Sequence, residues 1–363
     1  MRSAELAAVG RPTHREPPLP RPRGPLSAFV VGHLREAPHA LGDQPPVDGA
    51  WDGDDFQLAL YTCYELHYRS FAGVDERWEW HPELLAFRAR LETAMEAGVA
   101  AVVGTVRSDA PVEDQLWALA QGRPVPGNGQ VAVEESPSLS SYIAERGTVE
   151  QVRELAVHRS AYQLKEADPH TWAIPRLAGA PKADMVEIQA DEYGGGVESK
   201  MHCSLFAVTM EELGLDSRYG TYLDSLPGRT LATVNLISLF GLHRRLRAAL
   251  VGHLAIFEMT SVLPMSRYAK ALARLGIGLP GRRFYEVHVE ADQHHQIVAA
   301  RDMAGRLAED EPALAPGILF GARAVMEVER RFADNVLTAW AQGRSSLLLP
   351  LPTQEVRLSP VGR

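Results

Sequence analysis

Cysteine is scarce in this chain of 363 residues, which contains only Cys63 and Cys203. Two cysteines do not supply a disulfide framework, and their low number favours a reducing compartment. No uninterrupted apolar run approaches the roughly 18 residues that a membrane span requires, and the first residues lack the apolar core of a secretory signal. The sequence therefore predicts a cytoplasmic protein without a membrane-spanning segment.

An excess of basic residues is missing as well. The chain has 46 acidic and 37 basic residues and a formal net charge of -9. A nucleic-acid partner favours a basic stripe on the protein, so we expect none here. With 45 % hydrophobic residues, the chain has ample material for a large core.

Convincing alternating strand patterns are also missing, and helical periodicity takes their place. Apolar residues recur at helical spacing between residues 54 and 98, for example at Phe56, Leu60 and Cys63. The helical pattern resumes at Ser138 and continues to Trp340, with breaks expected at Pro169, residues 194–196, Pro227, Pro264 and Pro280. The sequence therefore predicts an all-α fold.

Three regions can be distinguished along the chain. Proline and arginine crowd residues 1–45, a composition that predicts an extended, disordered tail. Residues 46–130 are expected to form an accessory helical region. The segment 122–129, rich in glycine and proline, is the strongest internal boundary. Residues 138–345 then form the main helical domain.

The most informative stretch places His288, Asp292 and His295 at positions i, i+4 and i+7. On a helix these side chains lie within roughly 60° of one another and share one face. Two imidazoles and a carboxylate suit a divalent first-row metal, and iron is favoured where oxygen and imidazole ligands mix. His294 lies about 100° away from this stripe and is not expected to be a ligand.

Two other interpretations of this stretch remain open. Its histidines and acids are also typical of a solvated polar face. His288 and Glu290 form the His-x-carboxylate pair of a facial-triad oxygenase, but that site normally lies on a strand and the surroundings here look helical.

Four further candidate ligands lie in apolar helical contexts. They are Glu166, Glu192, His202 and Glu258. Glu258 is the most informative, because its helix is apolar nearly all round and a buried carboxylate is costly unless it is paired or bound to metal. Ordinary alternatives are a salt bridge from Glu258 to Arg244 or Arg245, a surface position for Glu192 and a core imidazole for His202.

Two more acid–imidazole pairs are less suited to a site. Glu65 and His67 are two residues apart and point roughly 160° apart on a helix, so we expect them to be structural. A ferritin-like centre needs two Glu-x-x-His motifs. The chain has one, Glu36 with His39, and Pro38 lies inside it.

From Glu166 to His295 the chain resembles the heme-oxygenase-like di-iron oxidases. That family places a glutamate on an early core helix, a second glutamate upstream of a histidine, a glutamate on a later helix, and His-x-x-x-Asp-x-x-His on another. The matching residues here are Glu166, Glu192 with His202, Glu258, and His288, Asp292 and His295. On an unbroken helix Glu192 would lie about 80° from His202, so the glycines at 194–196 must bend or unwind it. His170, four residues after Glu166, is an alternative ligand.

The resemblance implies a seven-helix heme-oxygenase fold without heme, here carrying an N-terminal helical extension. It implies two irons, O2 as co-substrate, an external electron donor and oxidation of a small organic substrate. Glu192 would bind the second iron and assist oxygen activation. Reactions in the family include N-oxygenation of amines, desaturation and oxidative C–C cleavage. A heme-binding protein, a metal-free scaffold, manganese in place of iron and a homodimeric assembly remain open.

Overall fold

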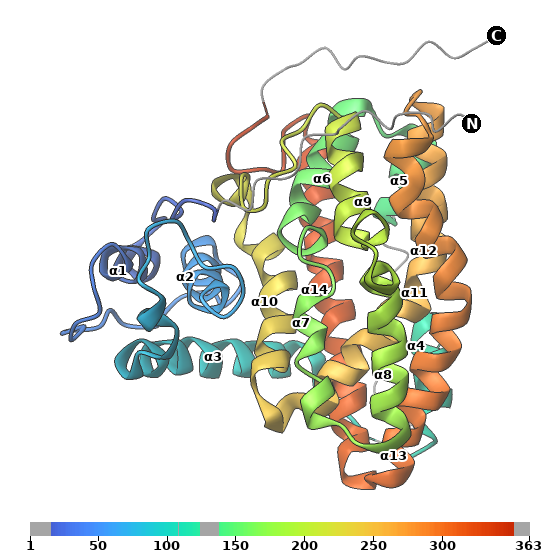
Figure 1. Cartoon of the computed structure of the whole chain (residues 1–363), viewed down its shortest axis with the longest axis horizontal. Helices are drawn as coiled ribbons and strands as arrows, with labels where there is room; N and C mark the ends of the chain where they lie inside the picture. Colours follow the sequence, from blue (N-terminus) through green and yellow to red (C-terminus); the bar gives the residue numbers. More distant parts are fainter. Residues whose placement is uncertain (1–15, 108, 124–137, 352–363) are drawn as a thin grey trace, which may run out of the picture.

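The computed structural model describes residues 16–107, 109–123 and 138–351. Within these ranges the secondary structure is helical and contains no strand, which confirms the predicted all-α fold. Figure 1 shows a tall bundle with a smaller lobe, drawn in blue and teal, attached to one side.

The side lobe contains three helices, α1 (Pro25–Leu34), α2 (Asp54–Glu65) and α3 (Pro82–Val103). Helix α2 lies between α1 and the bundle helix α10 (Gly228–Leu242) and packs against both. Every residue of α2 from Phe56 to Glu65 is buried, so this helix is the core of the lobe.

The prediction of a disordered tail over residues 1–45 is wrong for residues 16–45, whereas residues 1–15 lie outside the described part. Pro25 occupies the start of α1, where its missing N–H costs nothing. Leu26, Val30 and Leu34 then form a buried face at helical spacing. Asp55 of α2 accepts hydrogen bonds from the first backbone N–H groups of α1. A short apolar stripe thus outweighs the proline-rich composition around it.

The bundle is formed by the remaining helices. They are α4 (Val112–Ala120), α5 (Leu139–Arg146), α6 (Val149–Gln163), α7 (Asp168–Thr171), α8 (Gly179–Glu192), α9 (His202–Glu212), α10, α11 (Arg247–Arg274), α12 (Leu279–Ile297), α13 (Arg306–Asp310) and α14 (Ala315–Ala341). A π-helical segment, Val298–Gly305, continues α12.

Helix α4 packs against α11, α14 and the π-helical segment, so it belongs to the bundle and not to an accessory layer. The predicted boundary at 122–129 therefore does not separate two packing units, and residues 124–137 lie outside the described part.

Helix α11 is the central element and packs along α12 on one side and α14 on the other. Its contact with α14 depends on two glycines. A Cβ atom on Gly252 would overlap the carbonyl group of Ile318, and one on Gly321 would overlap that of Ala249. The break expected at Pro264 does not occur, since α11 continues through it. Packing against two neighbouring helices outweighs the roughly 3 kcal/mol that an interior proline costs.

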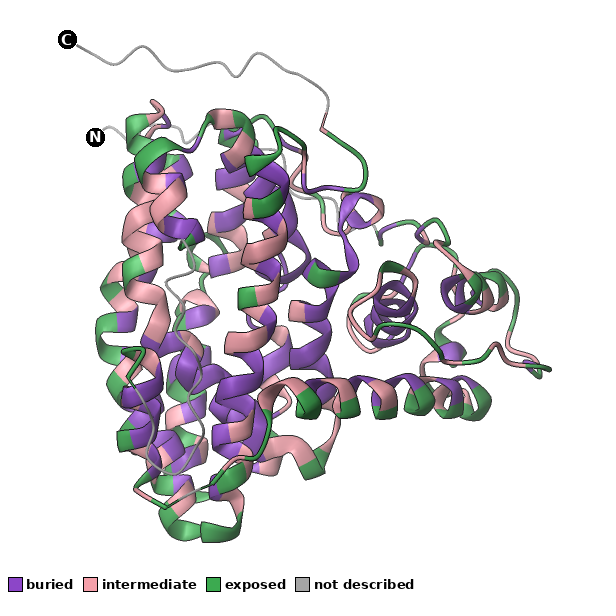
Figure 2. Ribbon diagram, turned by 180° about the vertical axis from the view of Figure 1, so that it is seen from behind, coloured by how far each residue is buried: buried purple, intermediate pink, exposed green. Residues whose placement is uncertain are grey.

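Buried residues line the inner faces of the bundle and of the lobe (Figure 2). One segment, Arg244–Arg274, is long and apolar enough by composition to cross a membrane, and 61 % of its most apolar window is buried inside the protein. The segment is not the uninterrupted apolar run that the sequence was expected to lack, since charged residues such as Arg247 and Glu258 lie within it. Its place at the centre of the bundle accounts for its composition.

Candidate metal centre

The stripe predicted on α12 faces the interior of the bundle. His288, Asp292 and His295 are buried. His294 points away, as its helical position predicted: its side chain is 66 % exposed and its Nε2 lies 3.0 Å from Glu187 Oε1. The helical register inferred from the sequence is therefore the one that the structure has.

Four other parts of the bundle bring the remaining candidates to this stripe. Glu166 lies in the turn between α6 and α7, Glu192 is the last residue of α8, and His202 is the first residue of α9. Glu258 extends from α11. All four side chains are buried.

The glycines between α8 and α9 do unwind the chain. Gly194, Gly195 and Gly196 have φ values of 62°, 61° and 80°, a backbone region that residues other than glycine rarely adopt. They end α8 directly after Glu192 and let α9 begin at His202 in a new direction. As a result His202 Nδ1 lies 2.7 Å from Glu192 Oε2.

The candidate atoms form two groups that share one residue. Glu166, Glu192, His202 and His288 each offer one ligand atom, and these atoms lie within 4.8 Å of one another. Glu192, Glu258 and His295 form a second group with the same property. Since metal–nitrogen and metal–oxygen bonds are about 2 Å long, ligands of one ion must lie within roughly 4 Å of each other. With atoms no more than 4.8 Å apart, both groups come close to that limit, and Glu192 belongs to both.

Asp292 lies beside the second group. Its Oδ1 atom is 3.7 Å from His295 Nδ1, and its Oδ2 atom accepts a hydrogen bond from Ser261 on α11. The structure thus brings six of the seven predicted residues into the two groups and places the seventh against His295.

Several buried polar atoms of this cluster make no hydrogen bond within the described residues. They are Glu166 Oε2, Glu192 Oε2, His202 Nδ1, Asp292 Oδ1 and His295 Nδ1. A buried polar atom without a partner costs about 1–3 kcal/mol, so five in one place require an explanation. Glu192 and His202 are close enough for a hydrogen bond but are not aligned for one. A bound cation would satisfy these atoms together, so the residues fit a metal.

The nitrogens that do not face the cluster are held by other partners. His288 Nδ1 lies 2.8 Å from the carbonyl oxygen of Phe284, which leaves Nε2 for the cluster. His295 Nε2 lies 3.0 Å from Asp191 Oδ2, which leaves Nδ1. Such outer contacts fix the ring and the tautomer of a ligating histidine.

Electrostatics show that the cluster demands positive charge. Burial raises the pKa of Glu258 to about 8. Burial opposes the charged form of His288, but Glu166, Glu192 and Asp292 outweigh it and raise its pKa to about 10. Asp292 and Glu258 likewise overcome burial and raise the pKa of His295 to about 11. Without a cation, protons on the imidazoles balance the carboxylates.

The alternative pairings proposed for these residues do not occur. Arg245 pairs with Glu96 and not with Glu258. His170 Nε2 faces His253 Nδ1 at 3.2 Å, away from both groups. Glu36 and His39 form a contact of 4.0 Å outside the bundle.

A cavity of about 410 Å³ adjoins the cluster. Ser261, which binds Asp292, and Phe284, whose carbonyl oxygen holds His288, both line it. Its aromatic lining residues are Tyr162, Phe206, Phe257, Tyr268, Phe284 and Tyr285. A charged pair, Arg159 and Glu329, lies among these rings.

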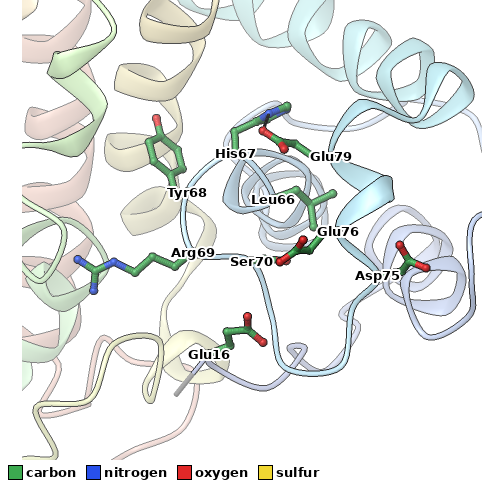
Figure 3. Close-up of a pocket in the computed structure, with 9 residues that line it drawn as sticks. All are labelled: Glu16, Leu66, His67, Tyr68, Arg69, Ser70, Asp75, Glu76 and Glu79. Carbon is green, nitrogen blue, oxygen red and sulfur yellow. Dashed lines mark hydrogen bonds and ion pairs between the residues drawn. The ribbon is translucent and has the colours of Figure 1, made fainter. Parts of the chain in front are cut away.

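A second hollow, of about 350 Å³, lies in the side lobe (Figure 3). It is lined by Glu16 and by residues between Leu66 and Glu79, and it contains none of the predicted ligands. His67 is held there by Glu79 at 3.2 Å and contacts Arg88, which agrees with the structural role expected for it.

The part of the chain that carries this arrangement resembles known proteins in sequence. Residues 153–330 match a family model described as iron-containing redox enzyme. This part of the chain is similar to the iron-containing redox enzymes. Nitrosourea synthase from Streptomyces achromogenes subsp. streptozoticus is 26 % identical to this chain over 220 residues, which are 59 % of this chain and 46 % of that protein. The chain therefore matches less than half of the length of this relative.

All seven candidate ligands lie within the residues that match the iron-containing redox enzymes, and the predicted family is confirmed. The residues that support these ligands were not predicted from the sequence. Asp191 and Ser261 hold His295 and Asp292, and Arg159 and Glu329 lie in the cavity. Only Asp191 could have been anticipated. A metal-binding histidine usually donates its second N–H to a carboxylate or carbonyl oxygen, so a partner of this kind was to be expected for His295.

Proposed function

We propose that the bundle holds two irons, one in each ligand group, with Glu192 shared between them. The observation that carries this proposal is the pair of buried groups joined at Glu192, together with their unsatisfied atoms. Charge supports it as well. Glu166, Glu192, Glu258 and Asp292 carry four negative charges when ionised, which two divalent ions neutralise.

Within this centre the residues have distinct tasks. Glu166, His202 and His288 would hold one iron, while Glu258, His295 and Asp292 would hold the other. Reduced iron supplies the redox chemistry that activates O2. Asp191 and the Phe284 carbonyl group keep the imidazoles of His295 and His288 oriented, and Ser261 fixes the carboxylate of Asp292. The aromatic rings of the cavity would give a small organic substrate an apolar surface beside the irons.

The cavity favours a substrate that carries both charges of an amino acid. Arg159 and Glu329 form a two-pronged ion pair with N–O distances of 2.8 and 2.7 Å, and their side chains are only 27 % and 23 % exposed. A ligand with a single charge would displace one partner and leave the other unpaired in a partly buried place, which is costly. A zwitterion replaces both contacts, its carboxylate on Arg159 and its ammonium on Glu329.

We further propose oxidation at nitrogen as the reaction, with the name of the related nitrosourea synthase in support. In such a step one atom of O2 forms a bond to nitrogen and the other leaves as water. The balance requires two electrons and two protons, which an external electron donor must supply. Desaturation and oxidative C–C cleavage are the alternative outcomes of the same centre.

The proposal is tested by loading the full chain with Fe(II) without oxygen and then adding O2. We expect two irons per chain and oxygen uptake that an amino acid accelerates more than a fatty acid or an alkylamine does. Products with an added oxygen on nitrogen, identified by mass spectrometry, would support N-oxygenation. A heme absorption band, or a protein that binds no iron, would refute the di-iron function.

A further inference from the structure

The turn that carries Glu166 is connected to the side lobe by the residue before it. Glu166 faces the metal cluster, where its Oε1 atom is 3.8 Å from His288 Nε2. Lys165 extends into the lobe instead, and its Nζ atom lies 2.9 Å from Glu65 Oε2 on α2. The side chains of Lys165 and Glu65 are 1 % and 0 % exposed, so this ion pair is fully buried.

Tyrosine rings enclose the Lys165 ammonium group. The ring centroids of Tyr68, Tyr61 and Tyr219 lie 4.2, 5.1 and 5.8 Å from Nζ. The Tyr219 hydroxyl also donates a hydrogen bond of 2.7 Å to Glu65 Oε2. Ring faces attract a cation, so the pair has several partners in place of water.

The same turn is held at neighbouring points. Figure 3 shows Tyr68 and Arg69 pointing from their loop toward the bundle. Arg69 lies 3.7 Å from Asp168 at the start of α7. On the other side, Gln189 of α8 donates a hydrogen bond of 3.1 Å to the carbonyl oxygen of Ala167. The backbone on both sides of Glu166 is thus fixed, by the lobe and by the helix that ends at Glu192.

A buried ion pair is a poor device for stability, because the cost of removing both charges from water offsets their attraction. Its advantage is that it fixes the geometry. Two buried charges have one favourable arrangement, whereas apolar side chains can pack together in several. Here the ion pair fixes Lys165, which directly precedes the candidate ligand Glu166. Both residues lie in a turn and not in a helix. Glu166 therefore lacks the support that α12 gives to His288 and His295.

We propose that Glu65 and Lys165 are positioning residues for the metal centre, through which the N-terminal lobe sets the place of Glu166. This inference rests on the proposed di-iron function. It assigns to the lobe a task in metal binding at the site that Glu166, His202 and His288 form, and none at the site of Glu258, Asp292 and His295.

The test compares iron binding with folding in the full chain. The double variant Lys165→Met/Glu65→Gln removes both buried charges at once and keeps similar volumes, so we expect a melting temperature close to that of the unchanged protein. Iron per chain and Fe(II) affinity, measured without oxygen by metal analysis and chelator competition, should show one iron bound at least about 10-fold more weakly and the other unchanged.

A matched control weakens the same interface away from the turn. Asn235 of α10 donates hydrogen bonds of 2.9 and 2.7 Å to the backbone and side chain of Gln57 on α2. Asn235→Leu should lower the melting temperature and keep both irons.

The outcomes separate the inference from the function on which it rests. Two tightly bound irons in the double variant would overturn the positioning role and leave the di-iron function intact. A double variant that does not fold, or an Asn235→Leu protein that loses iron equally, would show a general structural role and overturn it too. If the unchanged protein binds no iron, the proposed function itself fails.

Discussion

Two clusters in the bundle each contain buried glutamate and histidine side chains, and they differ in how their polar atoms are satisfied. One, here named the C-terminal latch, comprises Glu154, His158, Trp340, Ser345 and Ser346. Glu154 accepts hydrogen bonds from Trp340 Nε1, Ser345 Oγ and the Ser346 backbone at 2.8, 2.8 and 2.6 Å. Both ring nitrogens of His158 have hydroxyl partners, Thr230 at 2.7 Å and Ser346 at 2.8 Å.

The metal cluster is the opposite case. Five of its buried atoms have no hydrogen-bond partner within the described residues, although imidazoles and carboxylates lie close together. The comparison shows that residue type does not distinguish a site from a structural network. What distinguishes them is whether the protein itself satisfies the buried atoms, since natural proteins rarely leave such atoms unpaired without a reason.

The largest effect is expected at the residue that both ligand groups share. Glu192→Ala removes one ligand from each iron, so both should be lost while the helical fold remains. Metal analysis after anaerobic loading, with circular dichroism on the same sample, measures the two quantities. An alanine variant that still holds two irons would show that Glu192 does not bridge the groups.

The corresponding change in the latch should affect folding alone. Glu154→Ala leaves Trp340 Nε1 and the Ser346 N–H without their acceptor, which should lower the free energy of unfolding by about 3 kcal/mol. Urea denaturation measures this loss. At temperatures where the variant is folded it should bind two irons, and a selective loss of iron would remove the distinction between the clusters.

Asp292→Ala tests the edge of the metal cluster. Removal of this carboxylate should weaken iron binding by about 10-fold or more, and oxygen uptake should fall with it. His294→Ala is the matched control, because it lies two residues away on the exposed side of the same helix and should change neither quantity. Equal damage in both variants would contradict the assignment of the buried stripe.

The smallest effect is a pH dependence of the latch. Burial, with a further contribution from the Arg159 charge, lowers the pKa of His158 to about 3, compared with about 6.5 in an unfolded chain. The unfolded state therefore binds the extra proton, so the stability is present above about pH 6.5 and is lost as the pH falls toward 3. The slope reaches at most about 1.4 kcal/mol per pH unit.

Urea denaturation of the iron-free protein between pH 7 and 5, compared with His158→Gln, isolates this contribution. The difference in unfolding free energy between the two proteins should shrink as the pH falls. A difference that stays constant would mean that His158 does not resist protonation.

The features that the sequence predicted correctly depend on local spacing. His288, Asp292 and His295 could be placed on one face because four- and seven-residue steps define a helical stripe. Glu258 was recognisable as a charge in an apolar helix. The unwinding at residues 194–196 followed from three consecutive glycines. In each case neighbouring residues alone determine the geometry.

The features that were missed depend on contacts between distant residues. Arg159 meets Glu329 across 170 positions, and Lys165 meets Glu65 across 100. No local sequence pattern predicts either ion pair. The helix Pro25–Leu34 was missed for a different reason, because an average composition over 45 residues concealed one short apolar face.

The most direct test of the di-iron centre is the position of the metal itself. Crystals of the protein loaded with Fe(II) without oxygen should give two anomalous peaks at the iron absorption edge, about 3.5–4 Å apart, as in other two-metal sites. One peak should lie among Glu166, His202 and His288 and the other beside Glu258 and His295, with Glu192 between them. A single peak, or peaks in the acidic hollow of the side lobe, would contradict the account.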